Sequence, residues 1–145
     1  QRGACGKMVT CSMDGRTLTV PKGSTILKAA EQAGIPIPHL CFLKDINEIA
    51  ACRVCLVEVD GHERLLTSCN NTVTEGMVIH TNSPRVRQAR RTNVQLILSQ
   101  HDCRCAVCVR SGNCSLQQLA NDKGCIGNPY GEKPHARQRR QRTQD

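Results

Sequence analysis

The chain has 145 residues and a mass of 15.9 kDa, which is room for one domain or two small ones. It contains one Phe, one Tyr and no Trp, so aliphatic side chains must supply its core. The formal net charge is +8, and no stretch approaches about 18 consecutive apolar residues, which argues against a membrane-spanning helix.

The first half of the chain predicts a small α+β domain. Alternating residues over 8–20, interrupted by the turn signal Asp14-Gly15, predict a β-hairpin. Ser24 is a typical helix N-cap and Gly34 a typical helix stop, so we expect a helix between them. Further strands are expected at 54–59, 64–67 and 77–80. A hairpin, one helix and further strands form an α+β pattern in which the helix crosses one face of the sheet.

The second half predicts helices and a tail. Ser83 followed by Pro84 predicts a helix that runs to about Ser99. Arginines crowd its first half, which indicates either a solvated face or a docking patch for an acidic partner. These arginines are Arg85, Arg87, Arg90 and Arg91. A short helix is expected near 116–121, and residues 128–145, which lack apolar periodicity, are expected to form a mobile basic tail.

Cysteine usage is the most informative feature of the composition. Eleven cysteines are far more than an ordinary intracellular domain of this length carries. No apolar signal-like run follows the first residues, so we expect a cytoplasmic location, where thiols stay reduced. Most of the cysteines also gather in two groups, at 41–69 and 103–114, instead of spreading as loop-closing disulfides do. Clustering and compartment together favour metal ligation.

The first group has the spacing Cys-x10-Cys-x2-Cys-x13-Cys. Such a loop can wrap four thiolates around two irons and two sulfides, as the plant-type Cys-x4-Cys-x2-Cys pattern does, although the first gap is ten residues here. The small residues Ala50 and Ala51 would let backbone N–H groups approach the sulfurs. The Cys-x2-Cys pair alone fits zinc equally well, so zinc stays an alternative. The candidate ligands are Cys41, Cys52, Cys55 and Cys69.

The second group has the spacing His-x3-Cys-x2-Cys-x5-Cys. One imidazole and three thiolates hold either a zinc ion in a closed structural site or a four-iron cubane. The neighbouring first group favours the cubane, because a second cluster would serve as an electron relay. Cys103 competes with Cys105, but only Cys105 leaves gaps that let the loop fold around one cube. The candidate ligands are His101, Cys105, Cys108 and Cys114.

The order of the two groups resembles the N-terminal iron–sulfur region of [FeFe] hydrogenases of the NAD(P)-linked, electron-bifurcating type. It is also similar to their relatives, the large electron-input subunit of complex I, NADP-reducing hydrogenases and some NAD-linked formate dehydrogenases. The resemblance covers about residues 7–127, and the segment HDCRCAVCVRSGNCSLQQLA is more similar to the hydrogenase branch. It implies a β-grasp [2Fe–2S] ferredoxin domain over 7–81 and a small helical His/Cys3 [4Fe–4S] domain over 82–127.

The resemblance further implies one [2Fe–2S] and one [4Fe–4S] cluster that relay electrons in a hydrogenase, complex I-like or formate dehydrogenase complex. The further cluster sites and catalytic domain of that family are not found in this sequence, so we assign no catalytic residue. We expect either a piece of a longer polypeptide or a free-standing electron-transfer subunit. The expected partners are other redox subunits or domains, with no direct small-molecule substrate. Thiols outside the two motifs are given no ligand role; they are Cys5, Cys11, Cys103 and Cys125.

A second hypothesis, of another class, is a zinc-stabilised nucleic-acid-binding module. A pI of about 9.1 and the Arg-rich end of the chain favour it. The near absence of aromatic side chains for base stacking opposes it. Nucleic acid is therefore not the expected partner.

Overall fold

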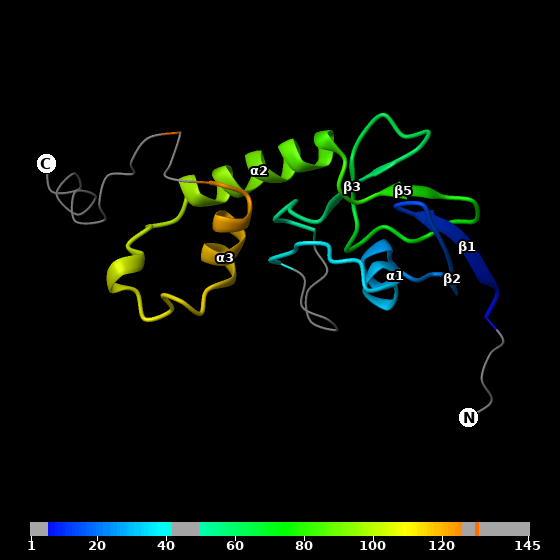
Figure 1. Cartoon of the computed structure of the whole chain (residues 1–145), viewed down its shortest axis with the longest axis horizontal. Helices are drawn as coiled ribbons and strands as arrows, with labels where there is room; N and C mark the ends of the chain where they lie inside the picture. The colour runs from blue at the N-terminus through cyan, green and yellow to red at the C-terminus, as the bar shows by residue number, and fades with distance from the viewer. Residues whose placement is uncertain (1–5, 42–49, 126–129, 131–145) are drawn as a thin grey trace, which may run out of the picture. The chain divides into compact units, whose positions relative to one another are not determined.

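The structure is a computed structural model that describes residues 6–41, 50–125 and 130 (Figure 1). The chain divides into two compact units, Gln1–Asn93 and Val94–Asp145. The boundary falls inside the long helix α2, Pro84–Ser99, so this helix begins in the first unit and ends in the second. The expected basic tail lies outside the described residues except for Tyr130, which is exposed.

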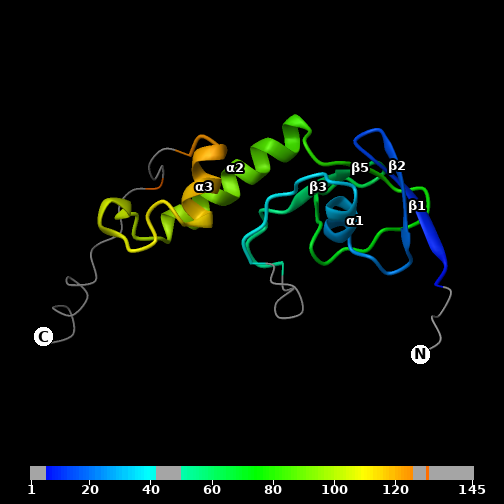
Figure 2. The ribbon, with the colours of Figure 1, turned by 60° about the horizontal axis from the view of Figure 1, so that its bottom comes forward.

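The first unit is a mixed five-stranded sheet with helix α1, Ile26–Gln32, packed against it (Figures 1 and 2). The strand order is β2-β1-β5-β3-β4, with β1 and β5 parallel and the other neighbours antiparallel. The strands are β1 Met8–Met13, β2 Arg16–Pro21, β3 Leu56–Val59, β4 Leu66–Thr67 and β5 Val78–His80. The predicted α+β class is confirmed.

The N-terminal hairpin forms where the sequence predicts it. Asp14 (φ 49°) and Gly15 (φ 81°) take the left-handed conformation that a tight hairpin turn requires. Alternate side chains of β1 enter the core, and Cys11 is 2% exposed. The expectation that Cys11 is an ordinary buried thiol is consistent with this position.

Helix α1 begins one residue later than the sequence predicts. Its N-cap is Thr25, whose Oγ1 accepts a hydrogen bond from the Lys28 N–H at 3.2 Å. The predicted cap, Ser24, is buried, and its carbonyl accepts the Val73 N–H at 2.9 Å. This tertiary hydrogen bond keeps Ser24 in the extended chain before the helix. The predicted stop is correct, since Gly34 has φ 70° directly after the C-cap.

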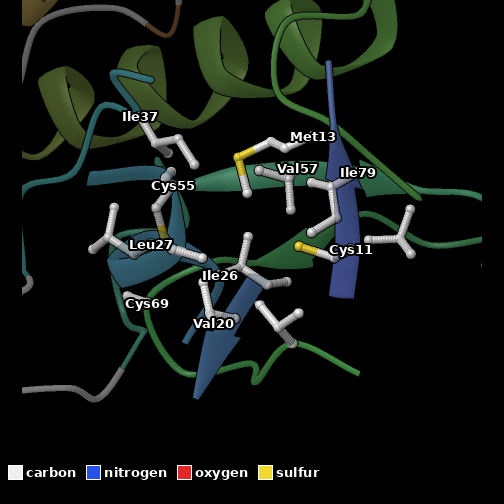
Figure 3. Close-up of a cluster of buried hydrophobic side chains, with 14 of the residues drawn as sticks. Cys11, Met13, Val20, Ile26, Leu27, Ile37, Cys55, Val57, Cys69 and Ile79 are labelled. Atoms are coloured by element: carbon white, nitrogen blue, oxygen red, sulfur yellow. The ribbon is translucent and has the colours of Figure 1, made fainter. Parts of the chain in front are cut away.

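The core of the first unit is aliphatic and sulfur-bearing in the part of the chain described (Figure 3). The buried face of α1 packs on β-strand residues such as Met13, Val57 and Ile79. Two of the predicted metal ligands, Cys55 and Cys69, belong to the same buried cluster. Each fully buried aliphatic side chain contributes about 1.5–3 kcal/mol, so the core can form without aromatic rings.

The second unit is helical. It contains the end of α2, the 3-10 turn η1 Cys105–Val107 and α3 Ser115–Asp122. The start of α2 is as predicted, with the Val86 N–H donating to Ser83 Oγ at 3.3 Å. Buried residues of this unit lie at the end of α2 and along α3; they are Val94, Leu98, Leu119, Ala120 and Cys125. Within the described ranges, no helix is long and apolar enough to cross a membrane.

The Asp14 carboxylate joins the hairpin turn to the end of the sheet. Its Oδ1 accepts the Thr81 N–H at 2.8 Å and its Oδ2 accepts the Thr81 hydroxyl. Thr81 is 4% exposed, so this contact is shielded from water. The first and last parts of the first unit are thereby held together across 67 residues of sequence.

Replacing Asp14 by Ala should destabilise the protein by about 2–4 kcal/mol, because two hydrogen bonds to a charged group are lost and Ala is strained at positive φ. Asp14→Asn keeps an acceptor and tolerates this φ, and should cost only about 1 kcal/mol. Urea unfolding followed by far-UV circular dichroism measures both. Equal losses in the two variants would contradict this account of the turn.

Candidate metal centre

The four thiols of the first group lie near one another in the structure. The Cys52 N–H donates to Cys41 Sγ at 3.4 Å. The charges of Cys55, Cys41 and Cys52 all act on the Cys69 thiol. Thiols from the loop after α1, from just before β3 and from just after β4 thus lie near one another.

The four thiols form an inner pair and an outer pair. The inner pair, Cys55 and Cys69, is 1% and 0% exposed within the core (Figure 3), and its side chains are hydrogen-bonded to each other. The outer pair, Cys41 and Cys52, is partly buried and shares its own side-chain hydrogen bond. Sulfur donors therefore reach the site both from the core and from its edge.

The environment of Cys69, in the inner pair, disfavours negative charge on its sulfur. Burial raises the pKa of Cys69 to about 12, aided by the hydrogen bond with Cys55 and by the charges of Cys55, Cys41 and Cys52. Four neighbouring thiols at the edge of a hydrophobic core cannot all carry negative charge near neutral pH unless a cationic centre compensates them. The donor set therefore fits a metal cluster. The Ser68 hydroxyl next to Cys69 fits it too, since it is buried and has no hydrogen-bond partner among the described residues.

Backbone N–H groups favour a thiolate in the outer pair. Burial acts to raise the pKa of Cys52, but hydrogen bonds from the backbone of Val54, Cys41 and Leu40, and from the Cys41 side chain, outweigh it and lower the pKa. Peptide N–H groups directed at sulfur are a common feature of iron–sulfur sites. They stabilise negative charge on the sulfur without adding a counter-ion.

The loop that carries Cys52 is strained on both sides of this residue. Ala50 has φ 53° and Arg53 has φ 54°, a left-handed conformation that costs a non-glycine residue about 1–2 kcal/mol. Such turns direct N–H groups toward one side of the chain. The sequence pointed to Ala50 as a small residue, and Ala50 is indeed buried, but nothing in the sequence singled out Arg53.

Helix α2 contacts this loop through two side chains that lie outside both cysteine motifs. Arg90 donates from Nε and Nη2 to the Leu56 carbonyl at 3.1 and 2.6 Å. Asn93 donates from Nδ2 to the Arg53 carbonyl at 2.6 Å. Burial lowers the pKa of Arg90 to about 10, so its guanidinium is still protonated at neutral pH.

The expectation of a solvated or docking arginine face on α2 is wrong for Arg90, which is 3% exposed. Two of its neighbours are exposed but also engaged within the first unit. Arg85 lies 3.7 Å from the Glu58 carboxylate and donates to the Glu63 carbonyl, and Arg87 donates to the Asn82 carbonyl at 2.8 Å. The sequence does contain a signal for the burial of Arg90, because Arg90 occupies one position in a row of buried residues spaced four apart along the helix. That row is Val86, Arg90, Val94 and Leu98.

The second group is not brought together in the same way. His101, Cys105 and Cys108 are exposed, and Cys114 is partly buried. Backbone hydrogen bonds order the loop locally, such as Cys108 N–H to Cys105 carbonyl at 3.3 Å. In the parts of the chain described, no three His, Cys, Asp or Glu side chains converge on a single metal position in either group. Burial, followed by the charges of Cys105 and Asp102, raises the pKa of Cys103.

The comparison with protein families is consistent with this site. Residues 6–84 match the 2Fe-2S iron-sulfur cluster binding domain, and the chain belongs to this family. Residues 90–125 match the NADH-ubiquinone oxidoreductase-G iron-sulfur binding region. The chain therefore binds one [2Fe–2S] and one [4Fe–4S] cluster, which confirms the predicted cofactors and sets the zinc alternative aside.

Relatives of known function are components of redox enzymes. The chain is 49% identical over 137 residues to NADP-reducing hydrogenase subunit HndD of Solidesulfovibrio fructosivorans, covering 90% of this chain and 23% of that protein. It is 38% identical over 116 residues to the mitochondrial NADH-ubiquinone oxidoreductase 78 kDa subunit of Candida albicans, covering 80% of this chain and 16% of that protein. The chain thus spans less than a quarter of the length of either relative.

A solved structure supports the fold. The NAD+-reducing [NiFe]-hydrogenase in the H2-reduced state matches with a TM-score of 0.79 and 31% sequence identity. The match covers 86% of this chain and 52% of that chain. A [2Fe–2S] ferredoxin-like domain followed by a [4Fe–4S] region is therefore the architecture of this protein.

Arg53→Gly should keep the [2Fe–2S] absorbance and stabilise the protein by about 1 kcal/mol, because glycine relieves the positive φ. Arg53→Val should lose about half or more of the bound [2Fe–2S] cluster, since a β-branched residue strongly resists this conformation. Visible absorbance and iron content per chain measure both effects. Arg64→Val, the same change at another arginine, is the control, and equal losses at both positions would refute a role for the strained turn.

Proposed function

We propose that this chain is the electron-transfer module of an NAD(P)-linked [FeFe] hydrogenase, relaying electrons between its [2Fe–2S] and [4Fe–4S] clusters. The observation that carries the proposal is the four-thiol site, with two thiols in the core and two at its edge, that precedes a second cluster-binding region in the same chain. The 49% identity to an NADP-reducing hydrogenase subunit supports this branch of the family. The chemistry that the bound clusters supply is one-electron transfer.

In this proposal the outer pair, Cys41 and Cys52, holds one iron of the [2Fe–2S] cluster and the inner pair, Cys55 and Cys69, holds the other. The pairing is supported by the side-chain hydrogen bonds within each pair. The thiolates supply the negative donors, and the backbone N–H groups around Cys52 moderate their charge. The core around the inner pair excludes water from that side of the site.

The [4Fe–4S] cluster is assigned to His101, Cys105, Cys108 and Cys114. All four residues lie within the matched iron–sulfur binding region, at 90–125. A neutral imidazole in place of one thiolate makes the ligand set less negative, which favours the reduced state relative to an all-cysteine set. The four side chains lie on or beside the loop between α2 and α3, so this site requires the loop to close around its cluster.

The assignment defines domains at 7–81 and 82–127, followed by a basic tail at 128–145. The partners are other redox subunits or domains of the hydrogenase complex, in the cytoplasm, and the chain contributes no catalytic residue. The alternative is the corresponding part of a complex I-like complex, which the 38% identity to an NADH-ubiquinone oxidoreductase subunit favours. A second alternative is the corresponding part of an [NiFe] hydrogenase, which the structural match to an NAD+-reducing [NiFe]-hydrogenase supports.

Replacing Cys52 by Ser should abolish the [2Fe–2S] signal and destabilise the first unit, because one iron loses a thiolate ligand. The second cluster should survive, so iron should fall from about six to about four atoms per chain. Electron paramagnetic resonance of the reduced protein, with iron analysis, measures both. A native-like [2Fe–2S] spectrum in this variant would remove Cys52 from the ligand set.

Cys103→Ser is the matched control for thiol loss. Cys103 is exposed and is not assigned as a ligand, so both cluster signals should remain at the level of the parent protein. Loss of the [4Fe–4S] signal from Cys103→Ser would instead move the assignment from Cys105 to Cys103.

His101→Cys should retain a [4Fe–4S] cluster with a lower reduction potential, because thiolate is a competent iron ligand and adds negative charge. His101→Ala should leave one iron without a protein ligand and give a labile or three-iron cluster. Redox titration and electron paramagnetic resonance of the two variants beside the parent test this. Midpoint potentials and spectra identical to those of the parent would show that His101 is not a ligand.

A further inference from the structure

Two side chains of helix α2 form hydrogen bonds with the backbone of the Cys52–Cys55 turn and of the residue after it. Arg90 and Asn93 lie three residues apart and thus on the same face of the helix. Arg90 binds the carbonyl of Leu56, the residue after Cys55, and Asn93 binds the carbonyl of Arg53, the residue after Cys52. The two contacts are therefore made within and directly after the Cys-x2-Cys turn, which supplies one thiol of the outer pair and one of the inner pair.

Arg90 is a buried cation without a conventional partner. It is 3% exposed, and within the described ranges no carboxylate forms an ion pair with it. Its hydrogen bonds to the Leu56 carbonyl place Arg90 beside the residue that follows Cys55, and Cys55 and Asp14 are the groups whose negative charge would act on it. Burying a charge without compensation is strongly unfavourable, so the position of Arg90 requires negative charge nearby. A thiolate-bound cluster beside Cys55 would supply that charge.

We propose that Arg90 sets the reduction potential of the [2Fe–2S] centre by providing a fixed positive charge beside Cys55, while Arg90 and Asn93 together position the ligand turn. The proposal rests on the assignment of Cys55 as a ligand made above. Reduction adds one negative charge to a centre that is already negative. A nearby fixed cation favours the reduced form, and its removal lowers the midpoint potential.

The charge is tested by redox titration of the intact protein, with the [2Fe–2S] signal read by electron paramagnetic resonance. In Arg90→Gln, the ratio of reduced to oxidised cluster at a fixed potential should fall about tenfold, which is a midpoint about 59 mV lower for a one-electron couple. Arg90→Lys keeps the charge and should stay near the parent. Arg87→Gln makes the same change in net charge at an exposed position of α2 and should leave the midpoint unchanged.

The positioning role is tested with Asn93→Ala. The Asn93 side chain is neutral, so its removal should leave the midpoint unchanged while the [2Fe–2S] cluster is lost several-fold faster to an iron chelator. Gln88→Ala, an exposed amide on the same helix, is the control and should keep the rate of the parent. Equal chelation rates for Asn93→Ala, Gln88→Ala and the parent would overturn the positioning role of Asn93.

Each result of the charge test decides the proposal. An Arg90→Gln midpoint equal to that of the parent overturns it, as does an equal shift in Arg87→Gln. If Arg90→Gln assembles no cluster, the result for Arg90→Lys decides. An Arg90→Lys protein with a [2Fe–2S] cluster at the parent potential supports the need for a positive charge. An Arg90→Lys protein with a shifted midpoint, or without the cluster, overturns the proposal. The ligand assignment is tested separately with Cys55→Ser. A parent-like [2Fe–2S] signal in this variant would refute the assignment of Cys55 as a ligand, whatever the result for Arg90.

Discussion

Two cysteine side chains that occupy the hydrophobic core impose the main constraint on the first unit. Cys55 and Cys69 are packed among aliphatic residues of α1 and the sheet, where burial, followed by the hydrogen bond with Cys55, raises the pKa of Cys69. Iron binds thiolates, so the same burial that supports the core opposes the charged form that the metal requires. The surrounding structure is arranged to resolve this conflict, through N–H groups at the outer pair and a guanidinium from α2.

The energetics of the cluster loop follow from this arrangement. Left-handed Ala50 and Arg53 cost about 1–2 kcal/mol each, which an isolated loop would avoid by changing conformation. A hydrogen bond from a charged donor contributes about 1.5–3 kcal/mol and one from a neutral amide about 1 kcal/mol. The contacts of Arg90 and Asn93 with the turn are therefore of the size needed to offset the strain. The cluster loop depends on a helix that comes later in the chain, not only on its own sequence.

Features with local signals were predicted well from the sequence. The hairpin at Asp14-Gly15, the stop at Gly34 and the Ser83-Pro84 helix start each depend on conformational preferences of a few neighbouring residues. Cysteine spacing also grouped four thiols that lie near one another in the structure, and their role as ligands stays a prediction. These inferences succeeded because the relevant interactions are short in sequence or are encoded in residue types with few other uses.

Features decided by distant contacts were missed. Thr25 replaces Ser24 as the cap because Ser24 is bound to Val73 across the fold. The strand expected from residue 54 begins at Leu56, since the residues before it belong to the turn held by α2. The buried role of Arg90 was hidden by its charge, which outweighed its place in a buried row. In each case the residue type gives the common behaviour and a tertiary contact overrides it.

The division of the thiols into two pairs also gives them different access to reagents in solution. The outer pair, Cys41 and Cys52, lies partly open to water, whereas the inner pair is sealed by the core. An oxidant or alkylating agent therefore meets the outer pair first and reaches the inner pair only when the first unit opens. Damage to the site should accordingly begin at its edge and proceed inward, and repair of the outer thiols alone would restore a protein whose core had remained folded throughout.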